Sequence, residues 1–190
     1  IEPVIVASAS RARKGGIKFL VKSFPPCPLK IMTDPHLIQQ ILNNLFSNAL
    51  KFTKTGSIEL AVGWEEGKTE NAHETNETLK LRVSDTGIGI SHDQQKVIFE
   101  RFVQADPSFP HSYGGTGLGL SLVQEIVRIL GGKLTLESDL GKGTTFNIDI
   151  PIKSTKFATI AKFNDGKNHY ILIMSKDEMT KEMIKQWAEA

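Results

Sequence analysis

The sequence predicts an α/β fold, because segments with the helical spacing of apolar residues alternate with segments in which apolar and polar residues alternate. Size supports this: 190 residues with 39% hydrophobic content suit one globular domain of about 150 residues and an appendage. Glycine pairs and proline clusters separate the segments and mark where each one ends. We therefore expect helices packed on a sheet.

The first third of the chain predicts helix, strand, helix. Residues 2–14 form a short amphipathic pattern that ends at two glycines, and 17–23 alternate like a strand before a proline-rich turn. Asp34 is the expected N-cap, and Pro35 the first residue, of a helix that runs to about residue 52. Its apolar stripe comprises Leu37, Ile38, Ile41, Leu42, Leu45, Phe46 and Ala49.

The remaining segments complete a mixed pattern. Strands are expected at 57–64 and 79–85, on either side of a polar, flexible hairpin loop. Further along, the pattern predicts a short helix over 93–102, an irregular polar segment over 103–116, and a long amphipathic helix over 117–130. Two last strands, 133–138 and 144–152, are joined by the turn Leu140-Gly141-Lys142-Gly143.

Composition excludes several classes of protein. With 23 Lys and Arg against 21 Asp and Glu, the net charge of +2 does not favour nucleic acid or a membrane surface as a partner. The single cysteine, Cys27, argues against a disulfide framework and favours a reducing compartment. Because the sequence shows neither a membrane-spanning apolar run nor a signal peptide, we expect a cytoplasmic chain, or the cytosolic portion of a membrane-bound sensor.

The helix over 34–52 carries three polar residues on the side that its apolar stripe leaves free. Asn44, Asn48 and Lys51 are spaced i, i+4 and i+7, so two amides and an ammonium share one face. An amide oxygen can complete the shell of a Mg²⁺ ion held by phosphate oxygens and water, while a lysine offsets phosphate charge. The alternative for this helix alone is a solvated face with incidental asparagines.

Two glycine clusters follow. In SDTGIGI at 84–90, Asp85 ends a strand and Gly87 and Gly89 allow close backbone approach, so the carboxylate can accept a hydrogen bond from the amine of adenine. GGTGLGLSL at 114–122 opens a helix whose free N–H groups suit phosphate. The alternatives are a strand-ending turn and a flexible loop before a helix. Neither cluster is a dinucleotide fingerprint or a Walker loop.

Taken together, these motifs resemble the ATP-binding catalytic domain of sensor histidine kinases, in the superfamily shared with gyrase, MutL and the ninety-kilodalton chaperones. The matching segments, over roughly residues 1–152, are NNLFSNALKFT at 43–53, DTGIGI at 85–90, IFERFVQAD at 98–106, GGTGLGLSL, and the turn that ends at Phe146. The resemblance implies a Bergerat-type two-layer α/β sandwich. We expect a mixed sheet of about five strands, with three helices on one face and a mobile lid over the nucleotide.

The resemblance also implies roles for individual residues. Asn48 is the expected Mg²⁺ ligand, Asn44 and Lys51 are catalytic residues on the phosphate side, and Asp85 reads adenine. Residues 103–117 are the expected lid, anchored by the buried rings of Phe99 and Phe102. The remaining residues expected to bind ATP or ADP are Gly87, Gly89, Gly115, Thr116, Gly117, Leu118, Gly119 and Thr144.

One position separates the chain from ATP-hydrolysing relatives. Gyrase-like members carry a water-activating glutamate where this chain has Asn44, and an amide is not a general base near neutral pH. We therefore expect a protein-histidine kinase domain that presents Mg-ATP to a histidine on a separate dimerisation domain in two-component signalling. In this family the phosphate-accepting histidine is followed by an acidic residue, with an Arg and a Pro nearby. None of the five histidines of this chain, His36, His73, His92, His111 and His169, has that setting, so autophosphorylation of this chain alone is not expected.

The C-terminal residues suggest a further module. After a linker over 153–168, residues 169–190 resemble the first strand and helix of a receiver domain. Ser175 and Lys176 stand where active receivers carry an acidic metal-binding pair, so the receiver would be degenerate. The alternative is a strand and a helix that pack on the kinase domain.

The expected partners are the histidine-bearing dimerisation domain of the same protein and a receiver domain or response regulator, with no nucleic acid. We expect this chain to be monomeric and the full-length protein to be a homodimer. Two other functions stay open: a pseudokinase that binds nucleotide without phosphotransfer, and a gyrase- or MutL-like ATPase, which the missing glutamate and near-neutral charge disfavour.

Overall fold

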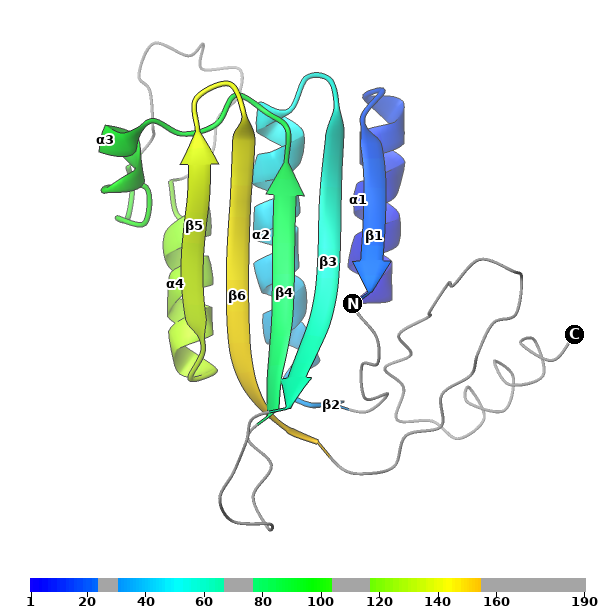
Figure 1. Cartoon of the computed structure of the whole chain (residues 1–190), viewed down its shortest axis with the longest axis vertical. Helices are drawn as coiled ribbons and strands as arrows, with labels where there is room; N and C mark the ends of the chain where they lie inside the picture. Colours follow the sequence, from blue (N-terminus) through cyan, green and yellow to red (C-terminus); the bar gives the residue numbers. More distant parts are fainter. Residues whose placement is uncertain (24–30, 67–76, 104–116, 155–190) are drawn as a thin grey trace, which may run out of the picture.

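The sheet is mixed, as predicted, and its five main strands follow the order β1-β3-β4-β6-β5 (Figure 1). The computed structural model describes residues 1–23, 31–66, 77–103 and 117–154. β1 pairs with β3 in parallel, and the other pairs are antiparallel. The strands are β1 (Lys18–Ser23), β2 (Ile31–Met32), β3 (Ser57–Glu66), β4 (Glu77–Asp85), β5 (Lys133–Asp139) and β6 (Gly143–Ser154).

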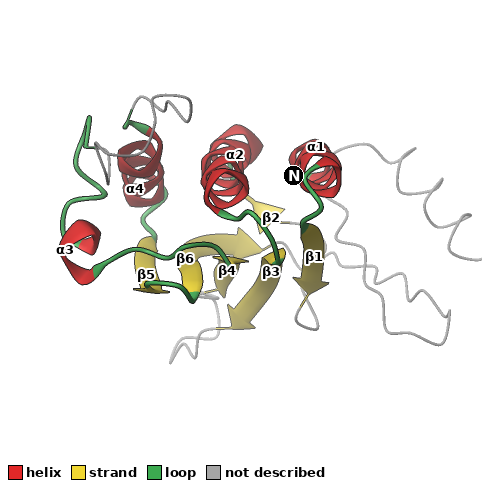
Figure 2. Ribbon diagram, turned by 90° about the horizontal axis from the view of Figure 1, so that it is seen from above, coloured by secondary structure: helices red, strands yellow, loops and turns green. Residues whose placement is uncertain are grey.

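Three long helices cover one face of this sheet, which confirms the predicted two-layer sandwich (Figure 2). They are α1 (Glu2–Lys14), α2 (Pro35–Phe52) and α4 (Gly119–Ile129), while α3 (His92–Gln95) is a single turn at the side of the sheet. The central helix α2 contacts both α1 and α4, so it lies in the middle of the helical layer.

Local sequence explains both ends of α2. The Asp34 carboxylate accepts hydrogen bonds from the backbone N–H of His36 at 2.8 Å and of Leu37 at 3.4 Å, and Pro35 occupies the first helical position. The helix ends at Thr53, where the backbone turns to an extended conformation. The residues of the predicted apolar stripe from Ile38 to Ala49 are buried. Leu37, the first residue of the stripe, is partly buried.

The core lies between the helices and the sheet. The Phe46 ring of α2 meets the Phe19 ring of β1 edge to face, with centroids 5.2 Å apart. Each fully buried Leu or Ile side chain here contributes roughly 1.5–3 kcal/mol relative to an exposed one. The sheet residues of the core are Ile58, Leu60, Val62, Leu79, Leu81, Val83, Phe146, Ile148, Ile150 and Ile152.

The opposite face of the sheet is polar. Across three neighbouring strands, Arg82 Nε donates to Asn147 Oδ1 at 2.9 Å, and Asn147 Nδ2 donates to Glu137 Oε1 at 2.9 Å. Alternation along the strands therefore assigns one face to the core and the other to a network of polar side chains.

Two details differ from the sequence-based prediction. The helix expected over 93–102 is limited to His92–Gln95 and is followed by turns, and the pair of residues in β2 was not predicted. β2 pairs with the last two residues of β6, so its partner is about 120 residues away in the sequence and no local pattern announces it.

Some predictions fall outside the described residues. These are most of the 65–78 hairpin loop, the 103–116 segment apart from Val103, and the linker and receiver-like residues from 155 onward. Among the described residues, no helix combines the length and the apolar character that crossing a bilayer requires.

Candidate functional site

The sequence-predicted site residues gather at one end of the sandwich. Asp85 ends β4, Lys51 lies in the last turn of α2, and Gly119 begins α4, while Thr144 follows the β5–β6 turn at the same end of the sheet (Figure 1). Antiparallel pairing of β4 with β6 sets Asp85 directly opposite Thr144. The ends of four elements that are separate in the sequence, α2, β4, α4 and β6, therefore lie at the same end of the sandwich.

Asp85 is held by backbone donors in a partly buried position. Its Oδ1 accepts a hydrogen bond from the backbone N–H of Gly87 at 2.8 Å, and the backbone N–H of Thr144 also donates to the carboxylate. Burial raises the pKa of Asp85 above its ordinary value, while these donors and the Thr53 hydroxyl lower that pKa. The carboxylate is thus oriented and only partly solvated, as a group that recognises one ligand edge must be.

The polar face of α2 turns toward α4. Asn44, Asn48 and Lys51 are all half-buried and lie within the continuous helix α2, outside its fully buried stripe. Asn44 Nδ2 donates to the backbone oxygen of Gln40 at 2.8 Å, and its amide oxygen faces Gly119, where a Cβ atom would lie 3.1 Å away. This fixes the Asn44 oxygen at the N-terminus of α4, beside backbone N–H groups that suit an anion.

The other two residues of this face make few contacts. The Lys51 ammonium lies 4.8 Å from the centroid of the Phe52 ring and forms no ion pair with a described residue. Asn48 makes no side-chain hydrogen bond within the described part of the chain. An unpaired ammonium and an unpaired amide at a shared face leave both groups available to a ligand.

The glycines of the 84–90 loop have a packing role that the sequence did not reveal. A Cβ atom on Gly87 would lie 2.5 Å from the backbone oxygen of Phe52, and one on Gly89, at φ +71°, would lie 1.9 Å from that of Asp139. The loop is therefore pressed between the end of α2 and the β5–β6 turn. Absence of a side chain at both positions is required by protein packing, whatever ligand binds nearby.

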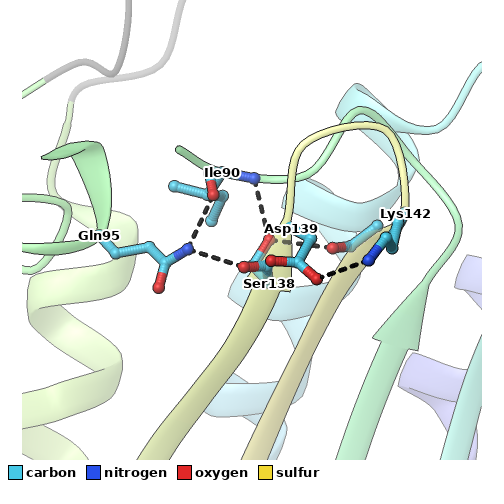
Figure 3. A network of polar contacts seen from close by, with 6 residues as sticks. Ile90, Gln95, Ser138, Asp139 and Lys142 are labelled. Atoms are coloured by element: carbon cyan, nitrogen blue, oxygen red, sulfur yellow. Dashed lines mark hydrogen bonds and ion pairs between the residues drawn. The ribbon is translucent and has the colours of Figure 1, made fainter. Parts of the chain in front are cut away.

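A hydrogen-bond network locks this loop to β5 (Figure 3). Ser138 Oγ accepts from the backbone N–H of Ile90 at 2.9 Å and lies 3.0 Å from Thr144 Oγ1. Gln95 Nε2 donates to the backbone oxygens of Ile90 and Ser138, both at 2.8 Å. Ser138 and Gln95 thereby connect α3, the glycine loop and the strand that leads to Thr144.

The two phenylalanines expected under the lid differ from each other. Phe99 is partly buried and packs against the core, whereas Phe102 as a residue is 72% exposed, so the expected burial of Phe102 is wrong. Phe102 adopts φ +66°, and its backbone N–H donates to the oxygen of Gly117 at 3.1 Å. A Cβ atom on Gly117 would lie 2.9 Å from the Phe102 backbone.

The N-terminus of α4 contains the last predicted ligand residues. Gly117 and Leu118 precede the helix, which begins at Gly119 rather than at 117. Gly115 and Thr116 lie outside the described residues. Sequence reasoning missed two residues of this end, Thr53 and Ser138; a threonine directly after an apolar stripe and a serine beside a glycine turn are weak signals that only packing distinguishes from ordinary surface residues.

The described residues suit a nucleotide whose phosphates bring their own metal ion. Within the described ranges, no three His, Cys, Asp or Glu side chains cluster as a metal site. One amide oxygen from Asn48 is the kind of single ligand that a phosphate-bound Mg²⁺ accepts. At the other end, the enclosed Thr53 hydroxyl lies beside the Asp85 carboxylate and lowers its pKa, although no described residue is placed in good hydrogen-bonding geometry to the hydroxyl.

Known proteins share this architecture. The chain is 40% identical over 141 residues to the autoinducer 2 sensor kinase/phosphatase LuxQ of Vibrio vulnificus, covering 74% of this chain and 16% of LuxQ. Full-length ShkA, solved in complex with AMPPNP, has a TM-score of 0.69 at 29% identity over 87% of this chain and 32% of ShkA. The nucleotide-free catalytic domain of the histidine kinase ThkA has a TM-score of 0.61 at 26% identity, covering 79% of this chain and 90% of that domain.

The similarity is confined to one part of the larger relatives. This chain spans about a sixth of the length of the curated relative LuxQ, whereas it covers most of the isolated ThkA domain. Residues 33–154, from just before α2 to the end of β6, match the family described as histidine kinase-, DNA gyrase B-, and HSP90-like ATPase. That match includes more than half of the chain and every described residue of the site, and the chain therefore belongs to this ATPase family.

Proposed function

We propose that this chain is the ATP-binding catalytic domain of a protein-histidine kinase. In this proposal it binds Mg-ATP and presents the γ-phosphate to a histidine on a separate dimerisation domain in two-component signalling. The observation that carries the proposal is the position of Asn44: this residue of α2 points its amide toward Gly119 at the N-terminus of α4. Sensor kinases among the relatives, and a neighbour solved with AMPPNP, support it.

The chemistry of the site fits transfer to an external nucleophile. Asn44 is half-buried and its amide cannot remove a proton from water near neutral pH, so rapid hydrolysis lacks its base. Lys51 and the N–H groups at the start of α4 supply positive potential for the triphosphate. A bound Mg²⁺, held by Asn48, would neutralise phosphate charge. The residues of the chain then act by orienting the phosphates rather than by acid–base chemistry.

The other components of signalling are also proposals. We propose that residues 1–152 form the catalytic domain, 153–168 a linker, and 169–190 the start of a degenerate receiver. We further propose a cytoplasmic setting, with the dimerisation domain of the same protein and a receiver or response regulator as partners. The relatives support this arrangement because this chain corresponds to only one segment of their much longer sequences.

The first experiment measures nucleotide binding by the chain itself. We expect Asn48→Asp to weaken Mg-ATP binding because it adds a negative charge beside the phosphates, and Asp85→Asn to weaken it because an amide presents an unwanted donor to adenine's amine. Asn43→Ala, an exposed position on the same helix, is the control and should bind normally. Unchanged affinity in both site variants, measured by calorimetry with Mg²⁺, would place the pocket elsewhere.

The second experiment tests transfer. In the full-length protein that contains this chain, γ-labelled ATP should place acid-labile phosphate on a histidine outside residues 1–190, and Asn48→Asp should abolish the label. Binding of ATP without any transfer, in the presence of the dimerisation domain, would favour a pseudokinase instead. Stable label on a histidine of this chain would contradict the proposed division of labour.

A further inference from the structure

Thr53 is buried without an ordinary structural reason for its hydroxyl. The residue is 2% exposed and its Oγ1 is fully enclosed; the hydroxyl lies near enough to the Asp85 carboxylate to lower the pKa of that group, but no atom in the part of the chain that the structure describes is placed in good hydrogen-bonding geometry to it. Leaving a buried hydroxyl unsatisfied costs about 1–3 kcal/mol, and valine has the same shape without that cost. A threonine at this position therefore points to a partner for the hydroxyl in another state of the protein.

The end of α2 places Thr53 against the adenine-reading carboxylate. The backbone oxygen of Phe52 accepts a hydrogen bond from Ile88 at 3.3 Å, and a Cβ atom on Gly87 would lie 2.5 Å from the same oxygen. The Thr53 backbone N–H is fixed by Ala49 at 3.0 Å. Thr53 thus belongs to a rigid helix end that is packed directly on the loop starting at Asp85.

The Asp85 carboxylate has room for one more donor. Gly87 occupies Oδ1 and Thr144 donates through its backbone, whereas a carboxylate offers about four acceptor sites. The Thr53 hydroxyl lies close enough to Asp85 to lower the pKa of that carboxyl. Burial has the largest effect on the pKa of Asp85 and raises it, and the groups that lower this pKa are the neutral donors of Gly87, Thr144 and Thr53.

We propose that Thr53 is a positioning residue that makes the site selective for adenine over guanine. When a nucleotide binds, its hydroxyl donates a hydrogen bond to Asp85 and holds the carboxylate with a free lone pair toward the exocyclic amine of adenine. Guanine presents a carbonyl oxygen at the same place, which an ionised carboxylate repels. The inference rests on the proposed function, because it requires that Asp85 reads the base.

The physical basis is the difference between an orienting donor and an apolar isostere. A hydrogen bond to a charged group contributes about 1.5–3 kcal/mol, roughly a tenfold to hundredfold change in affinity. Thr53→Val preserves volume and removes only the donor. Thr53→Ser preserves the donor and removes a methyl group. A purely structural role would be sensitive to the methyl group, whereas the proposed role is sensitive to the hydroxyl.

The test compares ATP and GTP affinity in these two variants of the chain. Thr53→Val should weaken ATP binding about tenfold and change GTP binding much less, so that the ATP-to-GTP preference falls by a similar factor. Its melting temperature should stay equal or rise, because an unsatisfied buried hydroxyl is removed. Thr53→Ser should retain the preference. Thr135→Val, at an exposed position of β5, is the matched control.

Coupling to Asp85 completes the test. In an Asp85→Asn background, Thr53→Val should cause no further loss of ATP affinity. The Thr53 hydroxyl acts only by orienting the Asp85 carboxylate, and that carboxylate is already absent in this background. The inference is overturned if Thr53→Val keeps the wild-type preference, or if it weakens ATP and GTP equally while lowering the melting temperature. In those cases Asp85→Asn still weakens ATP binding and the proposed function stands; if Asp85→Asn and Asn48→Asp also have no effect, both the inference and the proposed function are wrong. Should Thr53→Val not fold, Thr53→Ala against Thr53→Ser decides by the same ratio.

Discussion

Asn44 and Gly119 meet where α2 approaches the start of α4: a Cβ atom on Gly119 would lie 3.1 Å from the Asn44 amide oxygen. The amide is held from the other side by its 2.8 Å hydrogen bond to the Gln40 backbone. This contact joins the helix that carries the proposed phosphate-binding face to the helix whose N-terminus is the second element proposed to bind phosphate. It makes the spacing of the two helices part of the site.

Gly119→Ala should therefore affect binding more than folding. Alanine favours a helix by up to about 1 kcal/mol over glycine, but its methyl group would displace the Asn44 amide by a few tenths of an ångström. We expect ATP affinity to fall severalfold while the melting temperature is kept, measured by calorimetry and by thermal unfolding. Gln124→Ala, exposed on the same helix, is the control; equal affinity in both variants would show that the contact does not matter to the ligand.

Replacing the amide with a carboxylate should change the fate of ATP. Asn44→Glu introduces a general base where the site has none, and general-base catalysis contributes about 10²–10⁴-fold in well-aligned sites. Without evolved alignment we expect a rise of about tenfold in steady-state hydrolysis over the slow wild-type rate. Asn44→Gln controls for side-chain length. Hydrolysis no faster in the glutamate variant than in the glutamine variant would contradict the placement of this residue beside the reacting phosphate.

Asp85 should make ATP binding sensitive to acid. Burial raises the pKa of Asp85 above its ordinary 3.8, so the carboxylate becomes protonated, and stops accepting from adenine, at a pH above that value. ATP affinity should therefore decline as the pH is lowered through the raised pKa. In the Asp85→Asn variant, the part of the decline in ATP affinity that Asp85 protonation causes should be missing. The comparison separates this effect from protonation of the ATP phosphates.

The same pKa shift has the opposite sign for stability. Since the folded state binds the Asp85 proton more tightly than the unfolded state, this group adds stability as the pH falls from the raised value toward 3.8 and costs stability above it. Asp85→Asn should consequently not lower the melting temperature at neutral pH. A marked loss of stability in that variant, measured by thermal unfolding, would mean that the ionised carboxylate is structurally required.

Ser138→Ala should loosen the glycine loop. The substitution removes the acceptor for the Ile90 N–H and the neighbour of the Thr144 hydroxyl, both partly buried. We expect a loss of about 1–3 kcal/mol in unfolding free energy, with a smaller loss of ATP affinity. Denaturant unfolding provides the measurement, and Thr135→Ala on the exposed side of β5 should cost little. An equal cost in both variants would remove Ser138 from the support of the site.

Local patterns were sufficient where structure depends on neighbours in the sequence. The cap at Asp34, the proline after it and the apolar stripe predicted α2 to within a residue, and the same helix placed Asn44, Asn48 and Lys51 on one face. The strands were found by alternation, since one face of the sheet is buried and the other is polar. Alternation does not apply to the two-residue β2, and the turns after α3 interrupt a pattern that suggested a longer helix.

The sequence by itself therefore determined the fold class, the main helices and strands, and the polar residues of the nucleotide-binding motifs, because periodicity and motif spacing are local properties. Only the tertiary structure decided that Thr53 is buried beside Asp85, that Ser138 joins β5 to the glycine loop, and that Phe102 is exposed. These features depend on contacts between α2, the β4 end and the β5–β6 turn. Burial and hydrogen bonding at such contacts arise from segments distant in the chain, so no single segment encodes them.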